Sequence, residues 1–352
     1  MILTDTMLDA AFKFRFTEAW EILDDSNVFS VKLSDGTLIY CIVMGQGGSH
    51  YSLGIYIGEK GFSTYLKSLI ANEYSNIAST LSLSSEFDCI NCDFMQAKDI
   101  ESDVKQTIRN FAERHDIKIP RKRGWIDFTR FVAFRGQSNI INEHDAYVAE
   151  EALKAATFFI NELKSGKSFS EVHLNPSGEY PSLDGGDTIP LITTDENGCY
   201  HISEATTPPL KKYPYIAPTF DNDILTHMVN SLEKSLHVEC RFVHFPLFIK
   251  NDDEPSTIGI FIMIDKNSHY MYQPLFLMDY PNNPQNLLAK LANYLCTIKA
   301  CPKQIDVNDE KTFLFIKDFC EKCGIKVHKA KSLPNLDNAC TEMVQNVMNT
   351  PF

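Results

Sequence analysis

Three acidic residues in the last third of the chain have types and spacing that could do chemistry. Asp265 ends a predicted strand, Asp306 lies near the end of another, and Glu342 lies in a predicted helix with thirty-five residues between it and Asp306. Carboxylates that converge can hold two Mg²⁺ or Mn²⁺ ions, which activate water and stabilise the leaving oxygen of a phosphodiester. The three residues are therefore candidate catalytic groups of a divalent-metal-dependent nuclease.

One concentrated basic segment offers a second chemistry. Arg121, Lys122 and Arg123 stand beside Trp125. The cations can bind phosphates and the aromatic ring can stack on a base, so this segment is a candidate nucleic-acid-binding site. The alternative is a loop whose arginines neutralise an acidic protein and whose aromatic residues enter the core. We favour the alternative, because short basic runs often match by chance.

The cysteines do not indicate a metal site. Cys320 and Cys323 at a helix end form one plausible ligand pair, with Cys301 and His328 as conceivable partners. A structural zinc site needs about four converging ligands. We therefore expect packed thiols and no bound metal outside the nuclease hypothesis.

Periodicity predicts an α+β protein in which one order of elements occurs twice. Three strands, a helix, a strand and a helix are expected in the N-terminal half, and the C-terminal half repeats this order with one further strand and helix. The N-terminal elements cover helix 8–24, strands 28–33, 37–44 and 52–57, helix 61–77, strand 87–94 and helices 100–115 and 143–164. The C-terminal elements cover strands 241–249, 258–265 and 270–278, helix 284–299, strand 304–307, helix 309–322, strand 325–328 and helix 335–348.

The predicted domains are residues 1–170 and 189–352, joined by a Ser-, Gly- and Pro-rich linker over 171–188. The second domain would begin with a hairpin (189–194 and 200–204) and a helix over 221–236. Ser-His-Tyr occurs at matching places in the two halves, at 49–51 and 268–270. Together with the repeated order, this predicts an internal duplication of βββαβα-type halves.

Net charge and hydropathy limit the partners. The formal net charge of −13 opposes non-specific attraction to nucleic acid or to an anionic membrane. The first residues lack the pattern of a signal peptide, and no apolar run approaches the ~20 residues that cross a bilayer. We expect a cytoplasmic protein without a membrane partner.

The C-terminal half resembles RNase-H-like folds, and residues 301–342 resemble the core of retroviral-type integrases and transposases. In that family a strand ends in a metal-binding Asp, and a later helix bears Glu; Asp306 and Glu342 match these two positions. The first acid of the family belongs on the first strand, but the predicted strand 241–249 contains none. Asp306 is followed by Val-Asn-Asp, so Asp309 competes for its role.

The whole chain also resembles a family of uncharacterised bacterial proteins with two domains of unknown function. The resemblance rests on Trp20, residues 42–45, 55–61 and 134–135, residues 301–305, Cys320, and residues 324–327 and 333–337. It implies no activity and no cofactor. The leading hypothesis is a non-enzymatic binding or scaffold protein with a protein partner and a degenerate RNase-H-like domain. The alternatives are the Mg²⁺- or Mn²⁺-dependent nuclease and a nucleic-acid-binding accessory protein.

Overall fold

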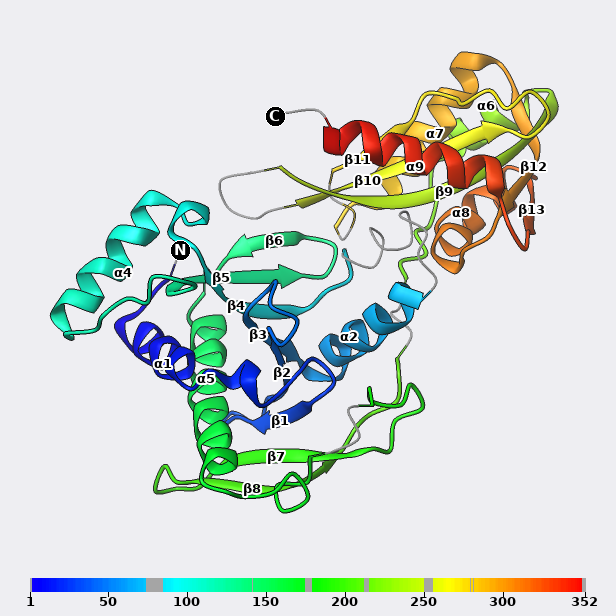
Figure 1. Ribbon diagram of the computed structural model, residues 1–352. Helices are drawn as coiled ribbons and strands as arrows, with labels where there is room; N and C mark the ends of the chain where they lie inside the picture. Colours follow the sequence, from blue (N-terminus) through cyan, green and yellow to red (C-terminus); the bar gives the residue numbers. More distant parts are fainter. Residues whose placement is uncertain are drawn as a thin grey trace. The chain divides into compact units, whose positions relative to one another are not determined.

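The computed structural model describes residues 2–73, 85–140, 142–174, 179–211, 215–249, 256–278, 280 and 282–349. The chain divides into two compact units, each with its own sheet (Figure 1). The first unit comprises Met1–Lys67, Phe87–Val132 and Gln137–Lys212, and the second comprises Ser68–Glu86, Ala133–Gly136 and Tyr213–Phe352. None of the described helices is both long enough and apolar enough to cross a membrane.

The first unit contains an eight-stranded sheet in the order β6-β5-β4-β3-β2-β1-β7-β8. Neighbouring strands from β1 to β5 are antiparallel, whereas β7 runs parallel to β1. The strands are β1 (Val28–Lys32), β2 (Leu38–Met44), β3 (Ser52–Ile57), β4 (Cys89–Met95), β5 (Trp125–Val132), β6 (Gly136–Asn139), β7 (Thr188–Thr194) and β8 (Tyr200–Thr206).

Helices cover both faces of this sheet. One face packs in a single core with α1 (Asp5–Phe16), α4 (Ser102–Arg114) and α5 (Glu143–Lys164). The other face receives α2 (Gly58–Glu73), whose Phe62 stacks on Tyr40 with 4.3 Å between ring centroids. Short 3₁₀ turns occur at Ala19–Glu21 and Ala97–Asp99.

The hairpin formed by β7 and β8 corrects the predicted domain boundary. We expected it to open the second domain, but β7 pairs with β1 in the first sheet, with Ser30 opposite Leu191. Residues 171–188 are therefore a connection within the first unit rather than a linker between domains. Turn-rich composition marks a loop, but it does not say which sheet the next strand joins.

The second unit contains a five-stranded sheet in the order β11-β10-β9-β12-β13. The strands β9, β10 and β11 are antiparallel neighbours, and β12 and β13 both run parallel to β9. This is the RNase-H-like arrangement that the sequence predicted. The strands are β9 (Lys234–Ile249), β10 (Ser256–Asp265), β11 (Leu275–Leu277), β12 (Cys301–Val307) and β13 (Lys326–Lys329).

Two layers of helices enclose this second sheet. Apolar residues of α7 (Gln285–Ile298) and α8 (Glu310–Lys322) pack on the face of Val238 and Phe242. The last helix, α9 (Pro334–Asn349), covers the opposite face, and α6 (Asp223–Asn230) precedes the sheet. Asp309 is the N-cap of α8, and its carboxylate accepts a hydrogen bond from Thr312 N at 2.7 Å. Asp309 therefore caps a helix.

Several predicted elements differ from the structure. The helix expected over 221–236 ends at Asn230, and β9 begins at Lys234, seven residues before the predicted strand. The strands β5 and β6 were not predicted, and positions 74–77 of the predicted helix 61–77 lie outside the described residues. The two halves also differ in strand pairing, because β4 is antiparallel to β3 whereas β12 is parallel to β9. The shared order of elements therefore does not give a shared sheet topology.

Candidate functional site

The candidate site is a row of polar residues across the second sheet, on the face that α9 covers. Asp306, near the end of β12, pairs with Glu239 of β9 on one side and with His328 of β13 on the other. Paired residues on neighbouring strands point to the same face, so their side chains are neighbours. The side chain of Asp306 has no exposure to solvent.

The carboxylate of Asp306 is surrounded by hydrogen-bond donors. Its Oδ2 lies 2.5 Å from Lys266 Nζ and 3.0 Å from His237 Nε2, and its Oδ1 lies 2.7 Å from Gln304 Nε2. His328 Nδ1 is 3.3 Å from Oδ1. Burial alone would raise the pKa of Asp306, but the hydrogen bonds from Lys266, Gln304 and His237 outweigh it and lower the pKa to about 2.

Glu239 is a candidate site residue that the sequence analysis missed. It supplies an acid on the first strand of the RNase-H-like sheet, which the prediction lacked because it began that strand at residue 241. A signal was present, because His237, Glu239 and Arg241 alternate with apolar residues at the period of a strand. Glu239 is only 4% exposed, and its Oε2 has no hydrogen-bond partner among the described residues.

The environment of Glu239 disfavours its charge. Burial raises its pKa, the positive charge of Lys266 opposes this effect, and the negative charge of Asp306 raises the pKa further. The pKa values of the two neighbouring acids therefore shift in opposite directions. Asp306 is held ionised, and Glu239 is shifted toward its neutral form.

A buried arginine fixes α9 beside this row. Arg241 lies two residues after Glu239 on the same face of β9 and is 8% exposed. Its Nη2 lies 2.6 Å from Asp337 Oδ1 of α9 and 3.0 Å from Asn308 Oδ1, just after β12. Arg241 thus links β9, the turn after β12 and α9.

The structure does not bring Asp265 into this row. Asp265 pairs with Val238, so it points to the face opposite Glu239 and Asp306. Its Oδ1 accepts hydrogen bonds from the backbone N–H groups of Ser268 (2.7 Å) and Asn267 (3.1 Å), which close the turn after β10 and lower its pKa. Its contacts are those of a turn residue.

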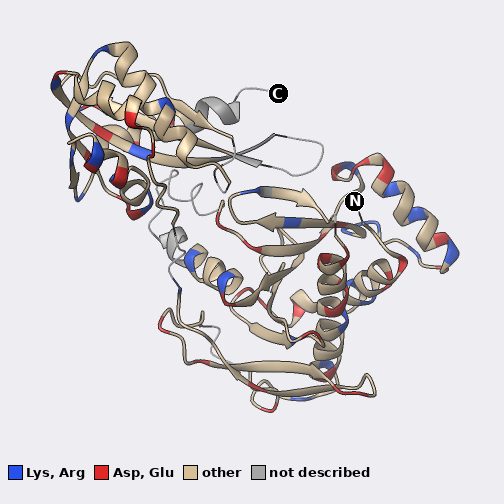
Figure 2. Ribbon diagram, turned by 180° about the vertical axis from the view of Figure 1, so that it is seen from behind, with Lys and Arg blue, Asp and Glu red and all other residues tan. Residues whose placement is uncertain are grey.

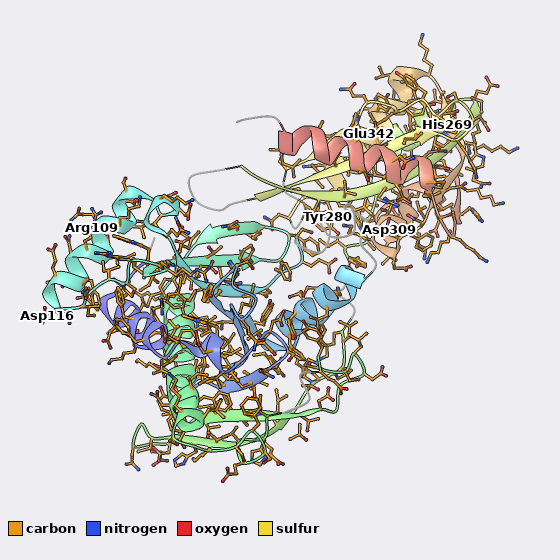
Figure 3. All side chains as sticks on the ribbon, in the orientation of Figure 1. Arg109, Asp116, His269, Tyr280, Asp309 and Glu342 are labelled. Carbon is orange, nitrogen blue, oxygen red and sulfur yellow. The ribbon has the colours of Figure 1, made fainter. Side chains whose placement is uncertain are left out.

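Glu342 is exposed on α9 (Figure 3). Cys340, two positions earlier, packs against the sheet. Two positions correspond to roughly 200° around a helix, so Glu342 lies on the side of α9 away from the sheet. The structure therefore joins Asp306 with Glu239 rather than with Asp265, and the catalytic role of Asp265, Asp306 and Glu342 stays a prediction.

The basic segment of the first unit is only partly exposed. Trp125 begins β5 and is 9% exposed, and the guanidinium of Arg109 lies 5.3 Å from its ring centroid. Arg123 lies over the ring of Tyr51 and donates a hydrogen bond to Gly48 O. Arg121 and Lys122 are exposed. Of the four predicted residues, Trp125 is thus a core residue and Arg123 a loop anchor, while the nucleic-acid-binding role stays a prediction.

Charges elsewhere are mixed. Lys and Arg positions lie interspersed with Asp and Glu along the described elements of both units (Figure 2). All ten cysteines are free thiols, and Cys301, Cys320 and Cys323 are buried. Among the residues that the structure describes, no group of three or more His, Cys, Asp and Glu side chains is placed to hold a metal ion.

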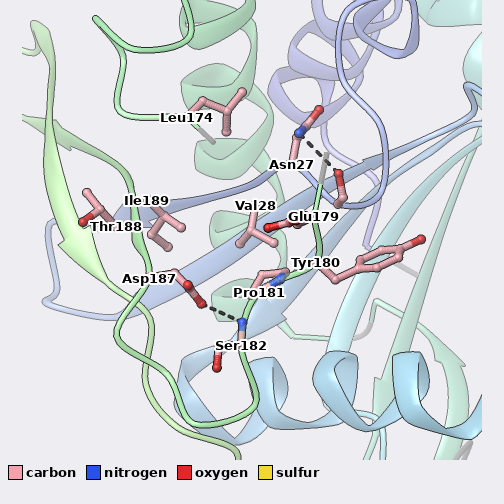
Figure 4. Close-up of a pocket in the computed structure, with 11 residues that line it drawn as sticks. Asn27, Val28, Leu174, Glu179, Tyr180, Pro181, Ser182, Asp187, Thr188 and Ile189 are labelled. Carbon is pink, nitrogen blue, oxygen red and sulfur yellow. Dashed lines mark hydrogen bonds between the residues drawn. The ribbon is translucent and has the colours of Figure 1, made fainter. Parts of the chain in front are cut away.

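A pocket of about 340 Å³ lies in the first unit (Figure 4). Its lining mixes apolar residues such as Val28 and Ile189 with the acids Glu179 and Asp187. Asp187 Oδ2 accepts a hydrogen bond from Ser182 N at 2.6 Å, so this carboxylate closes the local loop. The contacts of Asp187 are structural and indicate no reaction.

The environment of Glu239 predicts a stabilising substitution. At neutral pH, Glu239→Gln should raise the free energy of unfolding by roughly 1 kcal/mol, because it removes a buried charge that lacks a partner. The folded-state pKa of Glu239 is raised, so the advantage of Gln should grow as pH rises above the ordinary value of 4.5. Urea unfolding followed by circular dichroism at pH 4 and pH 8 measures both effects. Equal urea midpoints for the wild type and Glu239→Gln at pH 8 would contradict a buried charge without a partner at Glu239.

The pairing of Asp306 predicts acid sensitivity. Its folded-state pKa of about 2 lies below the ordinary 3.8, so its contribution to stability is present above about pH 4 and is lost as pH falls toward 2. Asp306→Asn should lower the free energy of unfolding by roughly 1–3 kcal/mol at pH 6 and should flatten this acid dependence. Urea unfolding followed by circular dichroism measures this change. Tryptophan fluorescence reports on the first unit alone, because Trp20 and Trp125 both lie there, and so serves as an internal reference. Exposed Glu342→Gln is the control and should leave the midpoint unchanged.

Comparison with known proteins identifies both parts of the chain as domains of unknown function. Residues 5–176 match the family described as Domain of unknown function (DUF7309), and residues 225–344 match Domain of unknown function (DUF6930). No curated protein matches the chain.

Two solved structures show a slight likeness. The HTLV-2 integrase catalytic core domain in complex with magnesium has 12% sequence identity and a TM-score of 0.23, over 34% of this chain and 78% of that chain. The simian T-cell lymphotropic virus intasome in complex with PP2A regulatory subunit B56 gamma has 10% identity and a TM-score of 0.25, over 40% of this chain and 50% of that chain. The chain therefore combines two domains, each matched by a family model of unknown function.

Proposed function

We propose that the protein is a non-enzymatic binding protein. In its RNase-H-like unit, side chains of the unit itself already occupy the carboxylate of Asp306. The observation that carries this proposal is the set of contacts around Asp306. Lys266 and His237 both reach Oδ2, while Gln304 and His328 lie at Oδ1. Both oxygens of the carboxylate are therefore engaged within the unit.

These contacts oppose metal binding at Asp306. A metal ion that bound this carboxylate would have to displace Lys266 and His237, and the positive charge of Lys266 would then repel it. Glu239, the nearest acid, is shifted toward its neutral form, whereas metal ligation requires ionised carboxylates. The row resembles an internal ion pair more closely than a magnesium site.

Exposed apolar side chains at the β11 edge indicate a protein partner. Phe276 pairs with Ile260, and Met271 bridges Ile264, so both point to the sheet face that α9 covers. Phe276 is 46% exposed and Met271 and Met278 are each 42% exposed. We call Met271, Phe276 and Met278 the β11 strip.

The position of the β11 strip favours a protein over a nucleic acid. The strand β11 is the edge of its sheet, and an edge strand offers unpaired backbone groups to an added strand. Exposed aromatic and Met side chains are typical of protein interfaces. The net charge of −13 opposes phosphate backbones. The binding surface that these features support is the β11 strip.

A photoreactive phenylalanine analogue at position 276 tests this surface. In cells that express the protein natively, we expect irradiation to give a discrete covalent adduct with a protein, identified by mass spectrometry. Position 16 is the matched control, because Phe16 is an exposed phenylalanine (53%) of the first unit. A nucleic-acid adduct at 276, no adduct, or the same adduct at both positions would contradict the proposal.

The second candidate is a divalent-metal-dependent nuclease, and one observation favours it. Glu239 places an acid on the first strand, directly beside Asp306, where the RNase-H-like frame requires one. The metal would then have to displace Lys266 and convert Glu239 to its charged form.

Nuclease activity separates the two candidates. The assay offers Mg²⁺ or Mn²⁺ with single- or double-stranded DNA and RNA. We expect the wild type to cleave no faster than Asp306→Asn, because neighbouring side chains already engage the Asp306 carboxylate. Gel-resolved products over time measure the rate. Metal-dependent cleavage that falls at least 100-fold in both Asp306→Asn and Glu239→Gln, but not in Asp309→Asn, would make the nuclease the function.

A further inference from the structure

A second row of polar residues crosses the first sheet, on the face that α2 contacts. Ser52 of β3 pairs with Asp93 of β4, and Asp93 pairs with Asp127 of β5. Directly opposite residues on neighbouring strands have Cβ atoms about 4.5–5.5 Å apart, and like charges there destabilise a sheet. The two carboxylates of this row are therefore neighbours with the same sign of charge.

The environment offers these acids little compensation. Asp93 is 9% exposed, and its carboxylate lies 3.0 Å from His50 Nε2. Asp127 lies directly opposite Asp93 on the neighbouring strand and is partly exposed. No Lys or Arg forms an ion pair with Asp93 or Asp127 within the described residues. The arrangement differs from that of Asp306, which has Lys266 at 2.5 Å.

Ser52 adds a second, independent observation on this face of the sheet. Its side chain has no exposure, and its Oγ has no hydrogen-bond partner among the described residues. A buried hydroxyl without a partner is costly, so it indicates a ligand or water at that point. Because Ser52 pairs with Asp93, this hydroxyl belongs to the same face as the two acids.

The row is accessible from solvent on the side of His50. This residue follows the loop of residues 45–48 between β2 and β3, and its side chain is 57% exposed. Arg123 anchors the loop, since it bonds to Gly48 O and lies over the ring of Tyr51. The loop is thus placed so that His50 reaches Asp93. Asp127 is also partly exposed.

We propose that Asp93 and Asp127 together bind one hydrated divalent cation of the Mg²⁺ and Mn²⁺ class, with Ser52 Oγ directed at the ion or at one of its waters. Such ions are commonly held by one or two carboxylates and keep several water ligands, so two acids suffice. The cation supplies positive charge that no Lys or Arg of the described residues gives to this row, and it gives Ser52 a partner. His50 lies 3.0 Å from Asp93 Oδ1 and marks the side from which the ion enters.

Isothermal titration of the full-length chain with MnCl₂ tests this site. We expect one saturable Mn²⁺ per chain, displaced by excess Mg²⁺. Asp93→Asn and Asp127→Asn should each weaken binding at least tenfold, because each removes a charged ligand. Ser52→Ala should weaken it less, about threefold, because it removes one neutral oxygen.

Two controls locate the ion. Asp103→Asn changes an exposed acid of α4 in the same unit, and Asp306→Asn changes the buried acid of the second unit. Both should keep wild-type affinity for Mn²⁺. In metal-free buffer the urea midpoint of Asp127→Asn should not fall below that of the wild type, since it relieves repulsion; this outcome separates lost binding from lost folding. Absence of saturable binding in the wild type, or binding that persists in Asp93→Asn and Asp127→Asn, would overturn the proposal.

Discussion

A carboxylate that is shielded from solvent must have its charge compensated, and in the second unit this constraint falls on Asp306. Its partners come from separate parts of the sheet: Lys266 follows β10, His237 lies on β9 and His328 lies on β13. Each contact can form only when these strands are in register. The buried charge thus requires the same strand pairing that the apolar faces favour, and a polar group that must be satisfied contributes to selecting one arrangement.

The apolar pattern predicted most of this unit. Except for β11, which covers only Leu275–Leu277 of the predicted 270–278, the helices and strands from β10 to α9 fall close to the predicted ranges. Each of them buries one face against the sheet and so shows the matching period. The start of β9 was missed for a related reason. The segment 234–240 alternates polar and apolar residues, but it follows directly on α6, and Val229 and Leu232 continued a helical spacing across the boundary. The error removed Glu239 from the first strand.

The partners of Asp306 were beyond prediction for a different reason. Spacing predicted that Asp306 ends a strand, but Lys266 and His237 are far from it along the chain and meet it only through strand pairing. The same limit explains β7, which joins β1 across a long separation. It also explains why one order of elements gave two different sheets, since local periodicity does not determine which strands pair.

The two acidic rows show what a sheet can do with a buried carboxylate. At Asp306, a lysine and histidines from adjacent elements approach the charge, and a neighbouring acid shifts toward neutrality. At Asp93 and Asp127 the neighbours are a second acid, one histidine and a serine whose hydroxyl has no hydrogen-bond partner within the described part of the chain. The first set already contains its cation, so an added metal would have to displace it. The second set has no Lys or Arg partner among the residues that the structure describes, and it is open to solvent beside His50. This difference in compensating charge is the reason why we propose cation binding in the first unit and binding through the surface for the RNase-H-like unit.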